Sequence, residues 1–206
     1  MIGEVKLFVR ANGADIGAEL FDTVSLDDFN EAQALWRPIL LQASEIMRAS
    51  GKAIPRYKHW DWSTKSRFLG RLDVTFFGIR CDNRLQGLMK ADVGTVQRCR
   101  LDVQKGKELV YVDYLETAPW NIAEYMRALE RRTLYGRVGV RLMQAAIRLS
   151  LENELKGRIG LHSLPAAEDF YRKMGMNPLH MDPQKQNLIW FEFTSEAANQ
   201  FLEKYI

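Results

Sequence analysis

The stretch GLHSLPAAEDFYRKMGM, residues 160–176, carries the clearest structural pattern in this sequence of 206 residues. Residues 158–163 predict a short strand, residues 165–174 predict a helix, and Gly175 is placed to end that helix. The strand therefore ends in polar side chains immediately before a helix begins, so this stretch is a natural place to look for a site.

The segments before this stretch supply an amphipathic helix, a long strand and a hairpin. Apolar residues from Val138 to Leu155 recur on one helical face, and Gly157 fits a cap at the end of that helix. A further segment of helical composition covers residues 121–134. Residues 108–115 (ELVYVDYL) predict the strongest strand, and residues 74–91 predict a hairpin around Asp82-Asn83-Arg84.

The two ends of the chain add helices and strands in the same way. Residues 4–10 alternate as a strand does. Ser25 is a predicted N-cap for a helix over residues 26–49, which Pro38 would interrupt or kink. Ser63 is a plausible cap for a short helix, and residues 187–205 predict a last strand followed by a terminal helix. No repeat or linker divides the chain, so we expect a single domain over residues 1–206.

The composition excludes several classes of protein. The chain has 29 Lys and Arg against 26 Asp and Glu, a net charge of +3 that is too even to predict a phosphate-tracking surface by itself. Cys81 and Cys99 form no CxxC pair and have no His at ligand spacing, so we expect neither a disulfide framework nor a metal site. The start is too polar for a signal peptide, and no run of about 18 apolar residues occurs. We therefore expect a cytoplasmic protein that does not cross a membrane.

Four segments, taken in order, resemble one known family. They are IRCDNRLQGLM (79–89), with a basic residue after the turn and then Gly87; LETAP (115–119); GRVGVRLM (136–143); and the opening stretch, whose Ala, Phe-Tyr and Gly pattern is the most specific. They resemble the central hairpin, the fourth strand, the acyl-CoA pyrophosphate loop and the fifth strand with its helix in the GCN5-related N-acetyltransferase (GNAT) superfamily.

The resemblance implies both a fold and an activity. The fold would be α/β of the α+β kind, with a mixed, mostly antiparallel central sheet flanked by helices. Residues 74–193 would bind acyl-CoA, acetyl-CoA first, and residues 1–73, which match only in order of elements, would form the acceptor side. The reaction would be direct transfer of an acyl group to an amine of a small molecule or a protein, by a monomer or homodimer.

The segment around Gly136 also fits a phosphate-binding loop on physical grounds. A helix that begins near Val138 leaves its first backbone N–H groups unpaired at the positive end of the helix dipole. Glycines there let a phosphate approach the backbone, and arginines add cationic donors. The expected cofactor-binding residues are Leu115, Thr117, Arg132, Gly136, Arg137, Val138, Gly139, Val140 and, facing the pantetheine arm, Ser163.

This loop departs from the family pattern, and the departure keeps a second function open. Leu134 stands where Gln or Arg is usual and Arg137 where Gly is usual, so a side chain replaces bare backbone. The connection from Pro119 to Tyr135 is also longer than the family's. The alternative is a non-catalytic GNAT-fold binding or interaction protein with a degenerate CoA site.

Acyl transfer to an amine needs a base for the amine proton and an acid for the leaving thiolate. Tyr171 matches by resemblance the tyrosine that often serves as the acid, and its alternative role is packing on the sheet. Glu116 is the general-base candidate, because a strand-end carboxylate beside Leu115 and Trp120 can have a raised pKa; its alternative is a solvated or salt-bridged Glu. Asp113, at i−3, is expected on the opposite strand face.

Polar and aromatic residues on both sides of the long strand are candidates for binding the acceptor. His162 is also the alternative base, and Ser163 could cap the helix that follows it. The tryptophans could equally be core anchors. The full acceptor-side set is His59, Trp60, Asp61, Trp62, Trp120, Asn121 and His162.

Arginines between residues 127 and 141 leave a third function open, a nucleic acid such as a charged tRNA as the acceptor. They fall at helical intervals, but Glu124 and Glu130 interleave them and favour a solvated helix face. These arginines are Arg127, Arg131, Arg132, Arg137 and Arg141.

Overall fold

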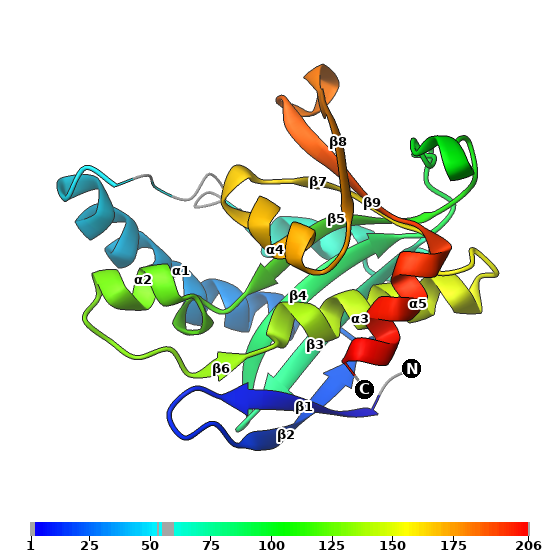
Figure 1. Cartoon of the computed structure of the whole chain (residues 1–206). Coiled ribbons are helices and arrows are strands. Elements are labelled where there is room, and N and C mark those ends of the chain that lie inside the picture. Colours follow the sequence, from blue (N-terminus) through cyan, green and yellow to red (C-terminus); the bar gives the residue numbers. More distant parts are fainter. Residues whose placement is uncertain (1–2, 53, 55–59, 206) are drawn as a thin grey trace.

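The computed structural model describes residues 3–52, 54 and 60–205, and these contain one nine-stranded sheet with helices packed on both faces (Figure 1). The strands are β1 (Gly3–Val9), β2 (Asp15–Phe21), β3 (Val74–Cys81), β4 (Arg84–Asp92), β5 (Val110–Thr117), β6 (Tyr135–Gly136), β7 (Ile159–Ser163), β8 (Asn177–Asp182) and β9 (Leu188–Phe193). Their order is β6-β1-β2-β3-β4-β5-β7-β9-β8, and only β5 and β7 pair in parallel. The mixed, mostly antiparallel sheet predicted from the motifs is confirmed.

The first long helix, Leu26–Ala49, begins where the local sequence satisfies its first N–H groups. The Ser25 side chain accepts a hydrogen bond from the Asp28 backbone, and an Asp28 carboxylate oxygen accepts one from the Ser25 N–H at 2.8 Å, which is a complete capping box. The helix after it continues through Pro38. The helices are α1 (Leu26–Ala49), α2 (Ala123–Ala128), α3 (Val138–Glu152), α4 (Glu168–Lys173) and α5 (Ser195–Lys204), with 3-10 turns η1 (Ser63–Phe68), η2 (Asp102–Gln104), η3 (Pro119–Asn121), η4 (Pro165–Ala167) and η5 (Pro183–Lys185).

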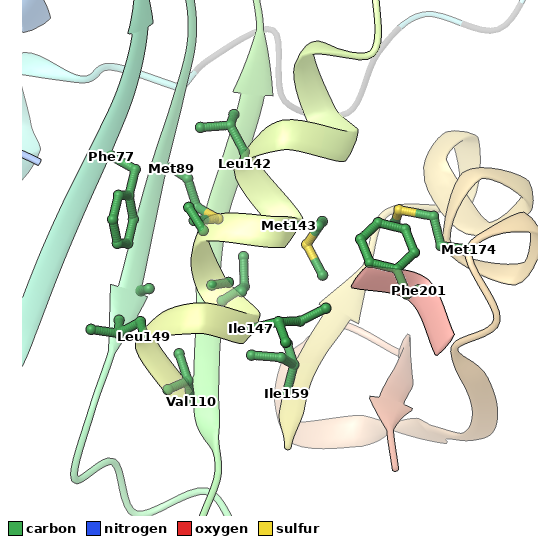
Figure 2. Close-up of a cluster of buried hydrophobic side chains, with 14 of the residues drawn as sticks. Phe77, Met89, Val110, Leu142, Met143, Ile147, Leu149, Ile159, Met174 and Phe201 are labelled. Atoms are coloured by element: carbon green, nitrogen blue, oxygen red, sulfur yellow. The ribbon is translucent and has the colours of Figure 1, made fainter. Parts of the chain in front are cut away.

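The sheet has two faces, which we name after their longest helices. On the α3 face, Leu142, Met143 and Ile147 of α3 belong to one buried cluster with strand residues such as Met89 and Ile159 (Figure 2). On the α1 face, apolar residues of α1, including Phe29, pack against β3 and β4 in a second cluster. Both clusters are almost fully buried, so each face is anchored by its own core.

The sheet opens between β5 and β7. Their parallel ladder contains only the pairs Val110 with Ile159, Tyr111 with Gly160, and Val112 with Leu161. Beyond Val112, β5 continues to Thr117 against β4, and no described strand pairs with its other edge. The backbone groups on that edge are therefore available to a ligand.

Three short strands were not predicted, and one predicted helix is shorter than expected. β2 and β8 each form a hairpin with the adjacent strand, β1 and β9 respectively. β6 depends on a partner distant in sequence, because its two residues pair with Phe8 and Val9. In the predicted helix over residues 121–134, only Ala123–Ala128 is α-helical, because Glu130 adopts a φ of 54° and the chain then turns back toward β1.

Two predicted caps are also wrong. Trp62, not Ser63, is the N-cap residue of η1, and the Asp61 side chain accepts from the Ser63 backbone at 2.8 Å. The helix before Gly157 ends earlier, at Glu152, with Asn153 as its C-cap residue. Among the described residues, no helix combines the length and the apolar composition needed to cross a bilayer.

Candidate active site

A cavity of about 800 Å³ occupies the opening between β5 and β7. On the α1 face its wall includes Glu116 and Trp60, and on the α3 face it includes the first turn of α3 and Tyr171. The cavity therefore passes from one face of the sheet to the other. Such a shape can hold an extended ligand on one face and a second reactant on the other.

Glu116 is the ionisable group best placed to exchange a proton in this cavity. Its side chain is buried, and the Trp62 indole Nε1–H donates to its Oε2 at 2.6 Å. Burial raises the pKa of Glu116 to about 7, against the opposing effects of the Trp62 hydrogen bond and the positive charge of Arg37. The raised pKa expected from the sequence is confirmed, and it is near the value that suits a general base.

Trp62 reaches Glu116 because η1 is fixed over the α1 face. The Trp62 ring stacks on Phe29 at a centroid distance of 5.8 Å. The Asp61 carboxylate fixes the start of η1 through Ser63. Asp61 and Trp62 were expected to contact an acceptor directly; instead, Asp61 holds the turn and Trp62 binds the carboxylate, and neither lines the cavity.

Tyr171 lines the cavity from α4, on the side opposite Glu116. Its ring packs near Phe191, with centroids 5.7 Å apart, and its hydroxyl has no hydrogen-bond partner among the described residues. Burial raises the pKa of the phenol well above its usual value, so the group stays protonated at neutral pH. Tyr171 therefore packs on the sheet and is a protonated phenol in the cavity wall.

The start of α3 supplies backbone donors. Val138, Gly139 and Val140 lie in the first turn and line the cavity, and their N–H groups precede the point where i−4 acceptors become available. Leu115 and Thr117 line the opposite wall from β5. The loop predicted to hold a pyrophosphate therefore faces the strand predicted to lie beside it.

The glycines of this loop also make room for neighbouring side chains. A Cβ at Gly139 would lie 2.8 Å from Phe170 Cζ, and one at Gly136 would lie 3.2 Å from Arg10 Nε. In the hairpin motif, a Cβ at Gly87 would lie 2.7 Å from a methyl carbon of Val138. The glycines thus permit the close packing of α3, α4 and β1 around the cavity.

Arg137 has the backbone conformation of a glycine, with a φ of 71°. Its guanidinium donates to Asp15 at 3.0 Å and lies over the Phe8 ring at 5.5 Å. The side chain is therefore directed to the β1–β2 hairpin, although Arg137 still contributes to the cavity wall.

Arginines line a second hollow of about 560 Å³ beside the loop, with Glu130 on its wall. Arg132 lies here and not in the main cavity. No described acidic side chain forms an ion pair with any of these arginines. Arg10 lines both spaces and was missed in the sequence, where only its place after the first strand marks it. The arginines of the hollow are Arg10, Arg127, Arg131 and Arg132.

Arginines expected to share a helical face are divided between different sites. Arg141 is buried and donates to the backbone oxygens of Lys6, at 3.0 Å, and Tyr205. Arg137 is paired with Asp15. The five arginines suggested as a nucleic-acid surface therefore do not form one surface.

The remaining acceptor-side candidates fall into two groups. Trp60 lines the cavity and meets Tyr114 edge to face at 5.0 Å. Trp120 is a core residue whose Nε1 donates to Gln86 at 2.8 Å. Asn121 lines the cavity but accepts from the Tyr135 backbone at 3.0 Å, so it also holds the loop. His59 lies outside the described residues.

His162 and Ser163 differ although they are adjacent. Ser163 is buried away from the cavity and donates to the Leu164 carbonyl at 2.9 Å; it does not cap the following turn, which begins from Leu164. His162 lines the cavity, with Nδ1 2.9 Å from the Tyr111 hydroxyl and Nε2 3.0 Å from Asp182 Oδ2. Sequence reasoning did not identify Tyr111 or Asp182.

The alternation argument for Asp113 is wrong because β5 contains a bulge. Lys90 pairs with Tyr114 and Ala91 with Val112, which leaves Asp113 as the extra residue. The Lys90 ammonium is 3.0 Å from Asp113 Oδ2 and lies over the Phe68 ring of the α1 face. Asp113 is thus paired with Lys90 on that face.

Within the described part of the chain, no three His, Cys, Asp or Glu side chains are grouped so that they could hold a metal ion. No protein-family model and no curated protein matches the sequence.

Solved structures share the fold. PaiA N-acetyltransferase from Thermoplasma acidophilum, in complex with coenzyme A, aligns over 86% of this chain and 98% of its own, with 16% identity and a TM-score of 0.55. FeeM, an N-acyl amino acid synthase from uncultured soil microbes, aligns over 92% and 97%, with 15% identity and a TM-score of 0.55. A GNAT-family acetyltransferase from Listeria monocytogenes aligns over 92% and 99%, with 10% identity and a TM-score of 0.53. The chain therefore has the GNAT fold that the four motifs predicted.

Proposed function

We propose that this protein transfers an acyl group, acetyl first, from acyl-CoA directly to a primary amine. The observation that carries the proposal is the cavity through the open sheet. It brings together the unpaired amides of α3, a carboxylate with a pKa of about 7 and a protonated phenol. Unpaired backbone donors, a base and an acid are what acyl transfer from a thioester requires.

The α3 face is proposed to bind the CoA moiety. The first-turn N–H groups of α3 and the guanidinium of Arg10 would hold the pyrophosphate, and Arg131 and Arg132 would attract the other phosphate charge from the neighbouring hollow. Leu115 and Thr117 would run beside the pantetheine arm. Bound acyl-CoA supplies an activated thioester, and the coenzyme A bound in the similar PaiA structure supports this choice of ligand.

The α1 face is proposed to bind the acceptor. Glu116 would accept a proton from the amine through water, and backbone N–H groups on the free edge of β5 would polarise the thioester carbonyl. Tyr171 would donate a proton to the leaving sulfur. Trp60 and Tyr114 would form an aromatic wall that can attract a cationic amine.

The N-terminal residues are proposed to belong to the same acyltransferase domain. α1 and η1 place Trp60 and Trp62 beside Glu116, and β1 places Arg10 beside the α3 loop. Residues 1–73 would thus serve the acceptor side and also the cofactor loop, while residues 74–193 carry the acyl-CoA core.

The test is acyl transfer by the full chain with acetyl-CoA and a panel of alkylamines, amino acids and lysine peptides. Thiol release and the mass of the amide product are measured. We expect a product 42 Da heavier than its amine, as an acetyl group replaces one hydrogen, formed stoichiometrically with thiol and lost in Glu116→Gln. No detectable binding of acetyl-CoA at millimolar concentration, together with no product, would favour the non-catalytic alternative, whose CoA site is degenerate.

A further inference from the structure

A hydrogen-bonded chain of side chains lies at the point where β5 and β7 separate. Tyr111 precedes Val112, the last residue of β5 that pairs with β7, and His162 directly follows Leu161, the last residue of β7 that pairs with β5. The Tyr111 hydroxyl is 2.9 Å from His162 Nδ1, and His162 Nε2 is 3.0 Å from Asp182 Oδ2. Tyr111 and His162 both line the cavity.

The neighbours of Asp182 fix the direction of every hydrogen bond in this chain. Oδ2 also accepts from Arg100 Nη2 at 2.8 Å, and Oδ1 accepts from the Gln184 backbone at 3.0 Å. These donors hold the pKa of Asp182 at about 2, so it is a carboxylate that can only accept. His162 must therefore carry its proton on Nε2, and its bare Nδ1 must accept from the Tyr111 hydroxyl. The Tyr111 hydroxyl oxygen can therefore accept a hydrogen bond from a ligand in the cavity.

The surroundings keep His162 neutral at physiological pH. Burial lowers its pKa, the positive charges of Arg100 and Lys185 act in the same direction, and Asp182 opposes them. The groups that face the imidazole are Tyr111 from β5, Asp182 from β8, Arg100 from the segment before β5, Lys185 from η5 and, edge to face at 4.9 Å, the Trp190 ring of β9. A neutral imidazole beside a carboxylate is arranged to receive a proton.

We propose that Tyr111 takes a proton from the ammonium form of the amine acceptor while passing its own phenolic proton to His162 Nδ1. One N–H bond of the ammonium breaks and its proton binds the Tyr111 oxygen; the Tyr111 O–H bond breaks and its proton binds Nδ1. The positive charge moves from the ammonium to the imidazole, where Asp182 neutralises it, and the neutral amine keeps the lone pair it needs for attack. Tyr111 is then a catalytic residue, whereas His162 and Asp182 are positioning residues: His162 accepts the phenolic proton and Asp182 holds the imidazole in place.

This step rests on the proposed function and adds a second proton acceptor to it. An ammonium ion loses one proton before it can attack and another as the amide forms. Glu116 lies five positions after Tyr111 along β5, about 16 Å at about 3.3 Å per residue, so the two groups are too far apart to hold one proton together. Tyr111, which lies where β5 and β7 separate, accepts the first proton, and Glu116 accepts the second through water.

The test compares two acceptors that differ in their protonation. One is the alkylamine with the highest turnover in the transfer assay, which is mostly ammonium near neutral pH; the other is hydroxylamine, which is mostly neutral there. In Tyr111→Phe and His162→Gln we expect transfer to the alkylamine to fall about 100-fold. In these variants the rate of transfer to the alkylamine should then rise about tenfold for each unit of pH, because the free amine accumulates. Transfer to hydroxylamine should change less than about threefold, a loss well below the full effect of a missing acid–base group.

His180→Gln is the matched control. His180 is an exposed histidine of β8, the strand that also carries Asp182, and it lies outside the cavity wall. It should leave both rates unchanged. Equal losses of rate with the two amines, or a loss without the change in pH dependence, would overturn the relay. The Tyr111–His162–Asp182 hydrogen bonds would then have only a structural role, and the wild-type protein would still be an acyltransferase. If the wild-type protein acylates no amine, the proposed function fails as well.

Nitrogen-15 NMR of labelled histidine tests the direction of the chain without any acceptor. The structure requires a protonated Nε2 and a bare Nδ1 on His162. The opposite tautomer would overturn the relay, because Tyr111 could then only accept from His162.

Discussion

Apart from Arg10, Arg137 and Tyr171, the cavity wall on the α3 face consists of backbone amides, small residues and apolar side chains, whereas the wall on the α1 face contains the ionisable side chains. Gly139 and Val138 are typical of the first wall, and Glu116 and His162 of the second. Ligand binding through backbone N–H donors depends on where a helix begins. Proton transfer depends on a few side chains held by distant partners.

This difference separates binding from chemistry. Changes on the α1 face should alter rates and pH profiles and leave the affinity for acetyl-CoA unchanged. Changes at the start of α3 should alter that affinity and leave the pH profile unchanged.

Glu116→Gln should produce the largest effect of a single change. The side chain keeps its shape and can still accept from Trp62 Nε1–H, but it can no longer take a proton. We expect turnover to fall by roughly 10²–10⁴, with the Kd for acetyl-CoA unchanged, as measured by thiol release and calorimetry. A variant that kept full turnover would remove Glu116 from the mechanism.

The same variant should change how stability depends on pH. The folded-state pKa of about 7 lies above the ordinary value of 4.5, so the folded protein holds this proton more tightly than the unfolded chain does. The wild type therefore loses stability as pH rises from the ordinary value through the folded one. Glu116→Gln avoids that loss, which is on the order of 3 kcal/mol at most.

Denaturant unfolding across this pH range measures the difference, with Glu203→Gln on the exposed side of α5 as the control. Glu203→Gln should follow the wild-type profile. A Glu116→Gln profile parallel to the wild type would mean that Glu116 is not perturbed by burial.

Gly87→Ala tests the α3 face. The new Cβ would lie 2.7 Å from a methyl carbon of Val138 and 3.1 Å from Leu142, so the start of α3 must move away from β4. We expect the Kd for acetyl-CoA to rise about tenfold, which corresponds to about 1.4 kcal/mol, with an unchanged pH profile. Gly17→Ala is the control, since its Cβ would meet only the end of the Glu4 side chain. A shifted pH profile would show that the two faces are not separable.

Trp62→Phe should have a smaller effect, confined to the α1 face. The Trp62 hydrogen bond lowers the pKa of Glu116, so its loss should move the acidic limb of the rate profile above about pH 7. Trp120→Phe removes another buried indole hydrogen bond, to Gln86, and should destabilise the fold without moving that limb. An equal shift in both variants would contradict the role given to Trp62.

Arg137→Gly should have the smallest effect on binding. Its guanidinium is occupied by Asp15, and glycine accepts a φ of 71° without the strain of about 1 kcal/mol that a larger residue bears. We expect the Kd for acetyl-CoA to change less than about twofold, a difference under about 0.5 kcal/mol. A tenfold loss of affinity would instead place the Arg137 guanidinium on the cofactor.

The sequence predicted local features well and long-range contacts poorly. The start of α3 at Val138 and the N-cap at Ser25 follow from neighbouring residues, and both were predicted. The Glu116 carboxylate was predicted to be perturbed, but its partner Trp62 lies 54 positions earlier and was expected elsewhere. The sequence therefore predicted the perturbed carboxylate on the α1 face but not the side chain that binds it.

Two further features had no readable signal in the sequence. The bulge at Asp113 arises from the register of β5 against β4, and it invalidates a simple alternation argument. The Tyr111–His162–Asp182 chain needs three strands and a turn to come together before its members become neighbours. The loop at Gly136 is determined by a few neighbouring residues. The side-chain clusters around Asp113 and His162 are determined by contacts between residues that are distant in the sequence.

Calorimetric titration of acetyl-CoA into the wild-type protein and Glu116→Gln tests the central claim most directly. The account predicts one molecule bound per chain in both proteins with the same Kd, because the α3 face binds the cofactor and Glu116 acts from the α1 face. No heat of binding to the wild-type protein at millimolar acetyl-CoA would contradict it.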